Sequence, residues 1–190
     1  RFFPEGKIVL TGNPVRSDIR AANVSQTAGR EHFFGPGADK KTIFIFGGSL
    51  GARSINEAVA ANSKSITDNP QVQILWQAGK LYIDEFRECA TAQLPNVKIV
   101  QFVDRMDMAY AAADAIIGRA GALTISELCL VGKPAILIPS PNVVEDHQTA
   151  NANALVAANA AILIKDSTAK TQIISRAIQV LEDEKLQRSL

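Results

Sequence analysis

Short apolar runs alternate along the chain with longer segments in which apolar residues recur at helical spacing. Residues 42–46 (TIFIF) form a continuous apolar run typical of a strand that is covered on both faces. We predict strands at residues 7–11, 42–46, 72–76, 97–102, 115–117, 135–138 and 161–164. We predict helices at residues 52–64, 80–92, 104–113, 122–132, 147–158 and 168–183.

This alternation determines the expected fold class. Strands that are joined through helices must run parallel, and right-handed crossovers then place helices on both faces of an open sheet. We therefore predict an α/β fold, a Rossmann-like doubly wound parallel sheet in one domain over residues 1–190, with residues 24–41 as a connector. Ligands bind such sheets at the carboxyl ends of the strands, where the strand order reverses.

Residues 118–134 contain the most informative of these strand ends. A buried strand ends here, turns on Gly118 and Gly121, and becomes a helix that stops at Gly132. A helix start of this kind presents free N–H groups and partial positive charge, so it favours an anion such as phosphate. Glu127, one turn inside the helix, can accept two hydrogen bonds from a cis-diol. The alternative is an ordinary exposed helix glutamate.

A second candidate site is the glycine-rich turn after residue 46. Gly47, Gly48 and Gly51 can wrap a phosphate with backbone N–H groups, and the Ser49 hydroxyl adds a donor. The spacing fits neither the dinucleotide pattern nor a P-loop, which lowers the case for a redox enzyme or an NTPase. Arg16, at the end of the first predicted strand, has a planar fork suited to phosphate, although an isolated arginine is commonly a surface residue.

The loop after residue 138 leads into a helix start that carries further polar residues. Glu145 fits the start of a helix, while Gln148 and Asn151 can hydrogen-bond sugar hydroxyls. No nucleophile elbow is present, so a hydrolase is not expected. Asp104 and Asp107 are better explained as a solvated helix start than as a metal pair, and we expect no metal site.

Composition limits the remaining classes. The chain is 47% hydrophobic with a formal net charge of +1, which is typical of a soluble globular domain and not of a nucleic-acid binder. Cys89 and Cys129 lie among apolar neighbours in predicted helices, which indicates a reduced, cytosolic chain. No apolar run is long enough to span a membrane, and no leader peptide is evident. Because the sequence begins without methionine, we expect a piece of a longer protein.

Five motifs together resemble one known family. In chain order they are residues 12–16 (GNPVR), 47–53 (GGSLGAR), 76–80 (WQAGK), 119–127 (RAGALTISE) and 146–152 (DHQTANA), and they cover nearly the whole chain. This set is similar to the MurG family of bacterial peptidoglycan N-acetylglucosaminyltransferases. The resemblance implies one half of a GT-B fold, the C-terminal UDP-GlcNAc-binding domain. The N-terminal acceptor domain is absent from these residues.

The resemblance also implies an activity and a location. Members of the family move GlcNAc from UDP-GlcNAc to lipid-linked MurNAc-pentapeptide, so the implied class is an inverting hexosyltransferase of cell-wall biosynthesis. The implied partners are UDP-GlcNAc and, through the absent domain, the lipid-linked acceptor, with no nucleic acid, cofactor, metal or transmembrane segment. The implied location is the bacterial cytoplasm, with the full-length protein peripheral on the inner membrane.

Each part of the donor nucleotide sugar has implied contacts. The resemblance assigns the diphosphate to Arg16 and Ser49, the phosphate and sugar to Ala122, Leu123 and Thr124, and the ribose hydroxyls to Glu127. It assigns uracil to Phe102, Val103 and Met106, with the backbone of Val103 contacting the edge of the base. It assigns GlcNAc to Gln148 with Asn151 and His147. No catalytic residue is implied within this half. Two alternatives stay open: a UDP-GlcNAc epimerase-like domain and a UDP-sugar-binding module without transfer activity.

Overall fold

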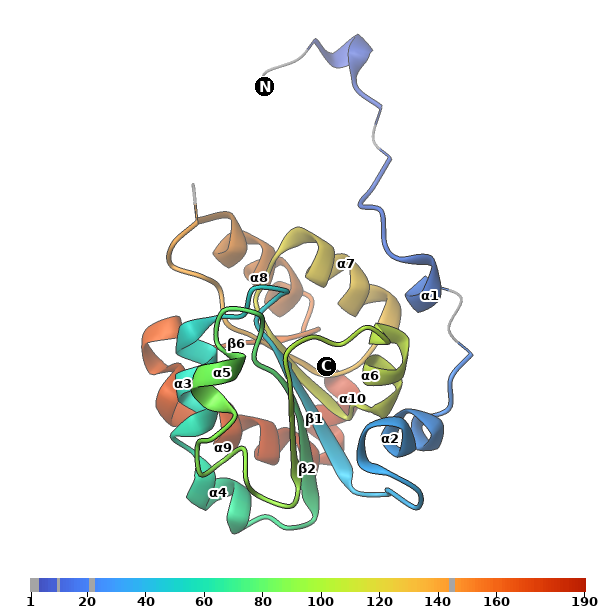
Figure 1. The fold of residues 1–190 in the computed structure, drawn as a ribbon. Coiled ribbons are helices and arrows are strands. Elements are labelled where there is room, and N and C mark those ends of the chain that lie inside the picture. The colour runs from blue at the N-terminus through green and yellow to red at the C-terminus, as the bar shows by residue number, and fades with distance from the viewer. Residues whose placement is uncertain (1–3, 10, 21–22, 144–145) are drawn as a thin grey trace.

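A parallel β-sheet covered by helices forms the body of the protein (Figure 1). The structure is a computed structural model and describes residues 4–9, 11–20, 23–143 and 146–190. Within these residues the sheet has six strands in the order β3-β2-β1-β4-β5-β6, and the order reverses between β1 and β4. The strands are β1 Lys41–Phe46, β2 Val72–Gln77, β3 Val97–Val100, β4 Ala115–Gly118, β5 Ala135–Leu137 and β6 Ile162–Leu163. The predicted doubly wound parallel sheet is confirmed.

Helices connect the strands and cover the sheet. They are α1 Ser17–Arg20, α2 Gln26–Phe34, α3 Arg53–Ala60, α4 Ser63–Thr67, α5 Ile83–Phe86, α6 Met106–Ala112, α7 Ala122–Val131, α8 His147–Ala157, α9 Ala169–Glu182 and α10 Glu184–Ser189, with 3-10 turns at η1 Glu5–Lys7 and η3 Asp166–Thr168. Among the residues that the structure describes, no helix is long and apolar enough to cross a membrane.

The alternation of side chains along β1 divides the core into two layers. Ile43 and Ile45 face a layer that contains residues of α3 and α9. Phe44 and Phe46 face the opposite layer, which contains residues of α6, α7 and α8. All four side chains are buried because both faces of the sheet are covered. Residues 42–46 are therefore continuously apolar because both faces of their strand are buried, as the sequence indicated.

The segment before α1 differs from our prediction. We expected a strand at residues 7–11, but no described residue there pairs with a strand, and Figure 1 shows the segment extending away from the sheet. Ile8 and Val9 are exposed. Apolar residues alone do not make a strand, because its backbone groups need a neighbouring strand. Residue 10 lies outside the described residues.

Two connecting segments also differ from the prediction. The expected connector at residues 24–41 contains α2, which begins after Ser25, whose hydroxyl accepts the Ala28 N–H, and ends at Gly35. The helix expected at residues 52–64 divides into α3 and α4. Between them, the Asn62 side chain donates to the carbonyls of Ala58 and Lys170. Side-chain bonds to the backbone compete with the helical pattern at such points.

The helix expected at residues 80–92 is much shorter than the apolar pattern indicated. It is reduced to α5 followed by turns, so Cys89 lies outside a helix. The buried Thr91 hydroxyl donates to the Ala60 carbonyl at 2.8 Å. This contact with the end of α3 fixes the segment in a non-helical path, and a tertiary bond of this kind is invisible to helical periodicity.

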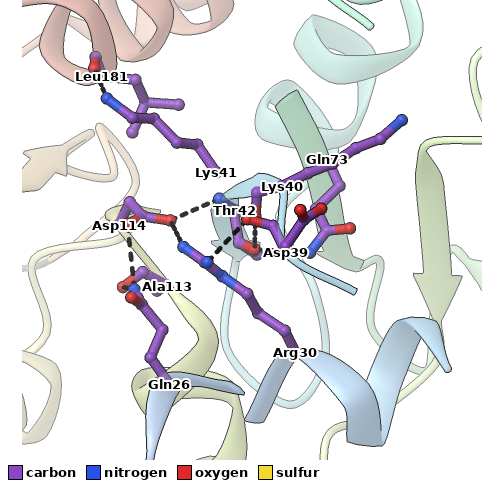
Figure 2. A network of polar contacts seen from close by, with 10 residues as sticks. All are labelled: Gln26, Arg30, Asp39, Lys40, Lys41, Thr42, Gln73, Ala113, Asp114 and Leu181. Atoms are coloured by element: carbon purple, nitrogen blue, oxygen red, sulfur yellow. Dashed lines mark hydrogen bonds and ion pairs between the residues drawn. The ribbon is translucent and has the colours of Figure 1, made fainter. Parts of the chain in front are cut away.

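A partly buried polar network holds α2 at the amino ends of β1 and β4 (Figure 2). The Asp114 carboxylate accepts bonds from Arg30 at 2.7 Å, from Gln26 at 3.0 Å and from the Thr42 N–H at 2.7 Å. Nearby, the Lys41 ammonium donates to the Leu181 carbonyl near the end of α9. The network lies at the edge opposite the carboxyl ends of the strands, so it stabilises the fold and leaves the other edge for ligands.

Candidate functional site

A cavity of about 460 Å³ lies at the carboxyl edge of the sheet, where the strand order reverses. The glycine turn after β1 and the residue after β4 both reach it, as expected for a doubly wound sheet. Gly47, Gly51 and Gln148 were predicted site residues, and all three line this cavity. Its other lining residues are Ala52, Arg53, Ser54, Glu57, Tyr82, Arg119, Ser140, Pro141, Asn142 and Asp166.

Backbone conformation and one close contact explain two glycines of the turn after β1. Gly48 and Gly51 have φ values of 87° and 89°, a region that side chains disfavour. A Cβ on Gly51 would collide with the Ala78 carbonyl, because the loop after β2 packs directly against this turn. Ser49 is exposed, and its carbonyl accepts the Lys80 N–H at 3.2 Å. The loop after β2 therefore supports one side of the turn, while Ser49 is exposed to solvent.

Arg119 joins three loops around the cavity, a role that its sequence motif did not reveal. Its guanidinium pairs with Asp166 at 2.5 Å and donates to the Ser54 hydroxyl at 2.9 Å. It also donates to the carbonyls of Ile138 and Pro139 at 3.0 and 3.2 Å. Because Asp166 and Ser54 also share a 2.6 Å bond, the start of α3, the end of β5 and η3 are fixed together.

The start of α7 keeps the features that suggested an anion site. Gly121 precedes the helix with no side-chain cap, and Gly132 ends it in the left-handed conformation. Ala122 and Leu123 are exposed, and Thr124 is half-buried. The first N–H groups of α7 therefore have no capping side chain within the described residues, so they can donate to a phosphate.

Glu127 is more constrained than an exposed helix glutamate. It is half-buried, and its Oε2 accepts the hydroxyl of Tyr110 at 2.7 Å. Burial, followed by this bond, raises the pKa of Tyr110, which keeps the phenol protonated and able to donate. Arg16 lies near enough for the charge of Glu127 to help raise the pKa of Arg16, after the larger effect of its hydrogen bond to Asp18.

Arg16 is placed beside α7 by the segment around it. The Asn13 amide donates to the Ser126 hydroxyl at 2.8 Å and to the Ala122 carbonyl at 3.3 Å, which ties the GNPVR motif to α7. The Arg16 guanidinium forms two bonds to Asp18 at 2.6 and 3.0 Å. It does not line the 460 Å³ cavity. To bind a diphosphate, Arg16 must share or exchange this carboxylate.

The three predicted uracil contacts follow β3, at the same edge of the sheet. Phe102 is exposed, Val103 is buried and Met106 is half-buried at the start of α6. The Val103 N–H already donates to Gln77 Oε1 at 2.8 Å. The edge of a base would therefore have to bond to the Val103 carbonyl, or displace Gln77 from the Val103 N–H. We expected the Val103 backbone to contact the base without this restriction.

The predicted sugar contacts come from α8, which packs against α7 (Figure 1). Gln148 Oε1 accepts the Ser140 N–H at 2.9 Å, so this cavity-lining side chain is bonded to the loop after β5. The Asn151 amide donates to the Ala120 carbonyl at 3.0 Å and so supports the lead into α7. His147 is exposed at the start of α8. Glu145 lies outside the described residues.

The predicted residues thus fall into two neighbouring groups at one edge. Gly47, Gly51 and Gln148 line the cavity, whereas Glu127 on α7 and Arg16 beside that helix lie outside the lining. Across the ranges that the structure covers, no group of three or more His, Cys, Asp or Glu side chains is placed to hold a metal ion. Sequence reasoning missed Gln77, Tyr110, Arg119 and Asp166, whose side-chain partners lie 17 to 112 residues away along the chain.

Comparison with known proteins gives a consistent result. Residues 42–189 match the family model described as glycosyltransferase family 28 C-terminal domain. A Bacteroides thetaiotaomicron protein named UDP-N-acetylglucosamine--N-acetylmuramyl-(pentapeptide) pyrophosphoryl-undecaprenol N-acetylglucosamine transferase is 45% identical over 100% of this chain and 51% of its own length. A Flavobacterium psychrophilum protein of the same name is 46% identical, with the same two coverages.

Solved structures agree with these relatives. The crystal structure of Acinetobacter baumannii MurG matches with a TM-score of 0.69 and 32% identity, covering 89% of this chain and 47% of that one. A UDP-N-acetylglucosamine 2-epimerase matches with a TM-score of 0.58 at 16% identity over 79% of this chain and 37% of the other, a likeness of fold alone. The chain spans about half the length of the curated relatives it matches.

Proposed function

The chain belongs to the family of glycosyltransferase family 28 C-terminal domains, and from this membership we propose that it is the donor-binding half of an inverting hexosyltransferase. The proposed reaction moves GlcNAc from UDP-GlcNAc to lipid-linked MurNAc-pentapeptide during peptidoglycan biosynthesis. The observation that carries the proposal is the edge where the strand order reverses. There the glycine turn follows β1, and the uncapped start of α7, with Glu127 one turn into the helix, follows the neighbouring strand β4.

The chemistry of these groups suits a nucleoside diphosphate sugar. The N–H groups of residues 122–124, the glycine turn with Ser49, and Arg16 would hold the diphosphate, while Glu127 would accept the ribose hydroxyls. Phe102, Val103 and Met106 would hold the base, and Gln148 with Asn151 would contact GlcNAc. When the acceptor hydroxyl attacks the anomeric carbon, the same donors stabilise the charge that develops on the leaving UDP.

The acceptor side of the reaction is proposed to come from outside these 190 residues. The lipid-linked substrate, the attacking hydroxyl and any general base would be held by the part of the relatives that this chain does not span. Because the proposed acceptor is lipid-linked, we propose that the full-length enzyme is a peripheral protein on the cytoplasmic face of the inner membrane. Without a bound acceptor opposite the donor, the 190-residue chain should transfer no GlcNAc, since proximity is missing.

Isothermal titration calorimetry of the 190-residue chain tests the proposal. We expect UDP and UDP-GlcNAc to bind with similar strength in the presence of EDTA, and ADP to bind much more weakly. Loss of binding in EDTA with recovery in magnesium would contradict the metal-free site, and absence of UDP binding would reject the proposal. Formation of UDP-ManNAc from UDP-GlcNAc would instead identify an epimerase.

A further inference from the structure

Tyr110 and Glu127 form a fixed pair between two helices. The Tyr110 hydroxyl, from α6, donates to Oε2 of Glu127, from α7, at 2.7 Å. The Tyr110 ring is held edge-on to Phe44 and Phe46, with centroids 5.8 and 6.3 Å away. Because Tyr110 is 2% exposed and packed on β1, its hydroxyl has little freedom to follow a moving partner.

The restraint acts mainly on the glutamate. A half-buried glutamate side chain has several rotatable bonds and samples many rotamers unless something holds it. The bond from Tyr110 occupies one side of Oε2 and holds the carboxylate in one orientation, while Oε1 and the remaining lone pairs can still accept. Tyr110 is almost fully buried, so its hydroxyl would act on a ligand through Glu127 and not by direct contact.

We propose that Tyr110 is a positioning residue that orients the Glu127 carboxylate for a ribose diol, so that the site selects ribonucleotides over 2′-deoxyribonucleotides. This inference rests on the proposed function, because it requires UDP as the ligand. A vicinal diol offers two donors at a fixed separation, and a carboxylate receives both only in a suitable orientation. A 2′-deoxyribose offers one donor, so it gains less from the orientation.

Tyr110→Phe removes the hydroxyl and keeps the ring. The half-exposed Glu127 carboxylate can then be solvated, so we expect the variant to fold, which a thermal melt verifies. UDP should bind about threefold to tenfold more weakly, the scale of one hydrogen bond. Binding of 2′-deoxy-UDP should change less, so the preference for UDP should fall. Adding Tyr110→Phe to Glu127→Ala should cause no further loss, because the tyrosine acts through the carboxylate.

The matched control is Thr91→Val. It also removes a buried hydroxyl, one that donates to the Ala60 carbonyl at 2.8 Å on the opposite face of the sheet. We expect it to lower the melting temperature without changing the preference for UDP. An equal loss of affinity for both nucleotides in Tyr110→Phe would assign Tyr110 a merely structural role and overturn the inference.

A measurement on the unsubstituted chain keeps the inference testable if Tyr110→Phe does not fold. With ¹³C-labelled tyrosine, the Cζ resonance of Tyr110 should move when UDP is added and move less with 2′-deoxy-UDP. The other tyrosine, Tyr82, is assigned by Tyr82→Phe. An unchanged Tyr110 resonance at saturating UDP would overturn the inference alone. Failure of the unsubstituted chain to bind UDP would overturn both this inference and the proposed function.

Discussion

The backbone N–H of Val103 donates to Oε1 of Gln77 at 2.8 Å, inside the protein. The same Gln77 side chain donates from Nε2 to the Gly48 carbonyl at 3.0 Å. One buried amide at the end of β2 therefore connects the glycine turn after β1 with the segment after β3. In the proposed function these are the phosphate turn and the base pocket, so Gln77 couples the two ends of the nucleotide site.

Gln77→Leu should destabilise the protein and loosen both loops. The substitution leaves the buried Val103 N–H without its Gln77 partner and removes one of the two bonds that the Gly48 carbonyl accepts, at a cost of about 1 to 3 kcal/mol in the free energy of unfolding. Urea denaturation measures the change. Gln71→Leu is the control, since Gln71 is exposed and its side chain donates to Asn69 at the surface. Equal stability of the two variants would contradict a structural role for the Gln77 bonds.

Glu127→Ala separates the two interpretations of that residue. If Glu127 binds the ribose diol, UDP affinity should fall about tenfold to a hundredfold, the equivalent of one or two charge-assisted bonds partly replaced by water. The variant should also bind UDP and 2′-deoxy-UDP almost equally. Calorimetric titrations with both nucleotides give the result. Equal affinity of the unsubstituted chain for the two would remove Glu127 from the ribose site.

Arg119→Met should destabilise the protein much more than the loss of an exposed ion pair does. Its side chain and that of Asp166 are only 15% and 21% exposed, so loss of one partner leaves a poorly solvated charge and two unpaired carbonyls. We expect a loss of about 2 to 4 kcal/mol by chemical denaturation. Lys64→Met, which breaks a pair that is 86% and 55% exposed, should cost less than about 0.5 kcal/mol. Similar losses would contradict the cross-linking role of Arg119.

Asp107 should contribute to the acid sensitivity of the fold. Its hydrogen bonds to Arg105 hold the pKa of the carboxyl below its ordinary value of 3.8. The stabilisation is fully present above the pKa of the unfolded chain and is lost as the pH falls through the lower folded pKa. Asp107→Asn should flatten the decline of stability below about pH 4.

Urea midpoints measured across the acid range test this expectation for Asp107. Asp84→Asn, at a side chain that is 88% exposed, serves as the control and should leave the acid decline as it is in the unsubstituted chain. An acid decline in Asp107→Asn as steep as that of the unsubstituted chain would contradict the assignment.

The sequence by itself determined the sheet and the central strand–turn–helix unit. The apolar run of β1 reports burial on both faces, and α7 begins after Gly121 and ends at Gly132 as its local pattern predicts. These features depend on interactions within a few residues, so a linear pattern records them. The same reasoning placed the candidate ligand loops at one edge, because carboxyl ends of parallel strands meet there.

Only the tertiary structure decided which side chains act together at that edge. The described residues among 7–11 form no strand because no neighbouring strand pairs with them. The expected helix at 80–92 ends at Phe86, and Thr91 in the turns that follow bonds to the end of α3. The bonds of Gln77 to Val103 and of Tyr110 to Glu127 join different elements across the sheet edge. Each depends on the packing of separate elements to within hydrogen-bond distance, and residue spacing along a chain does not encode that distance.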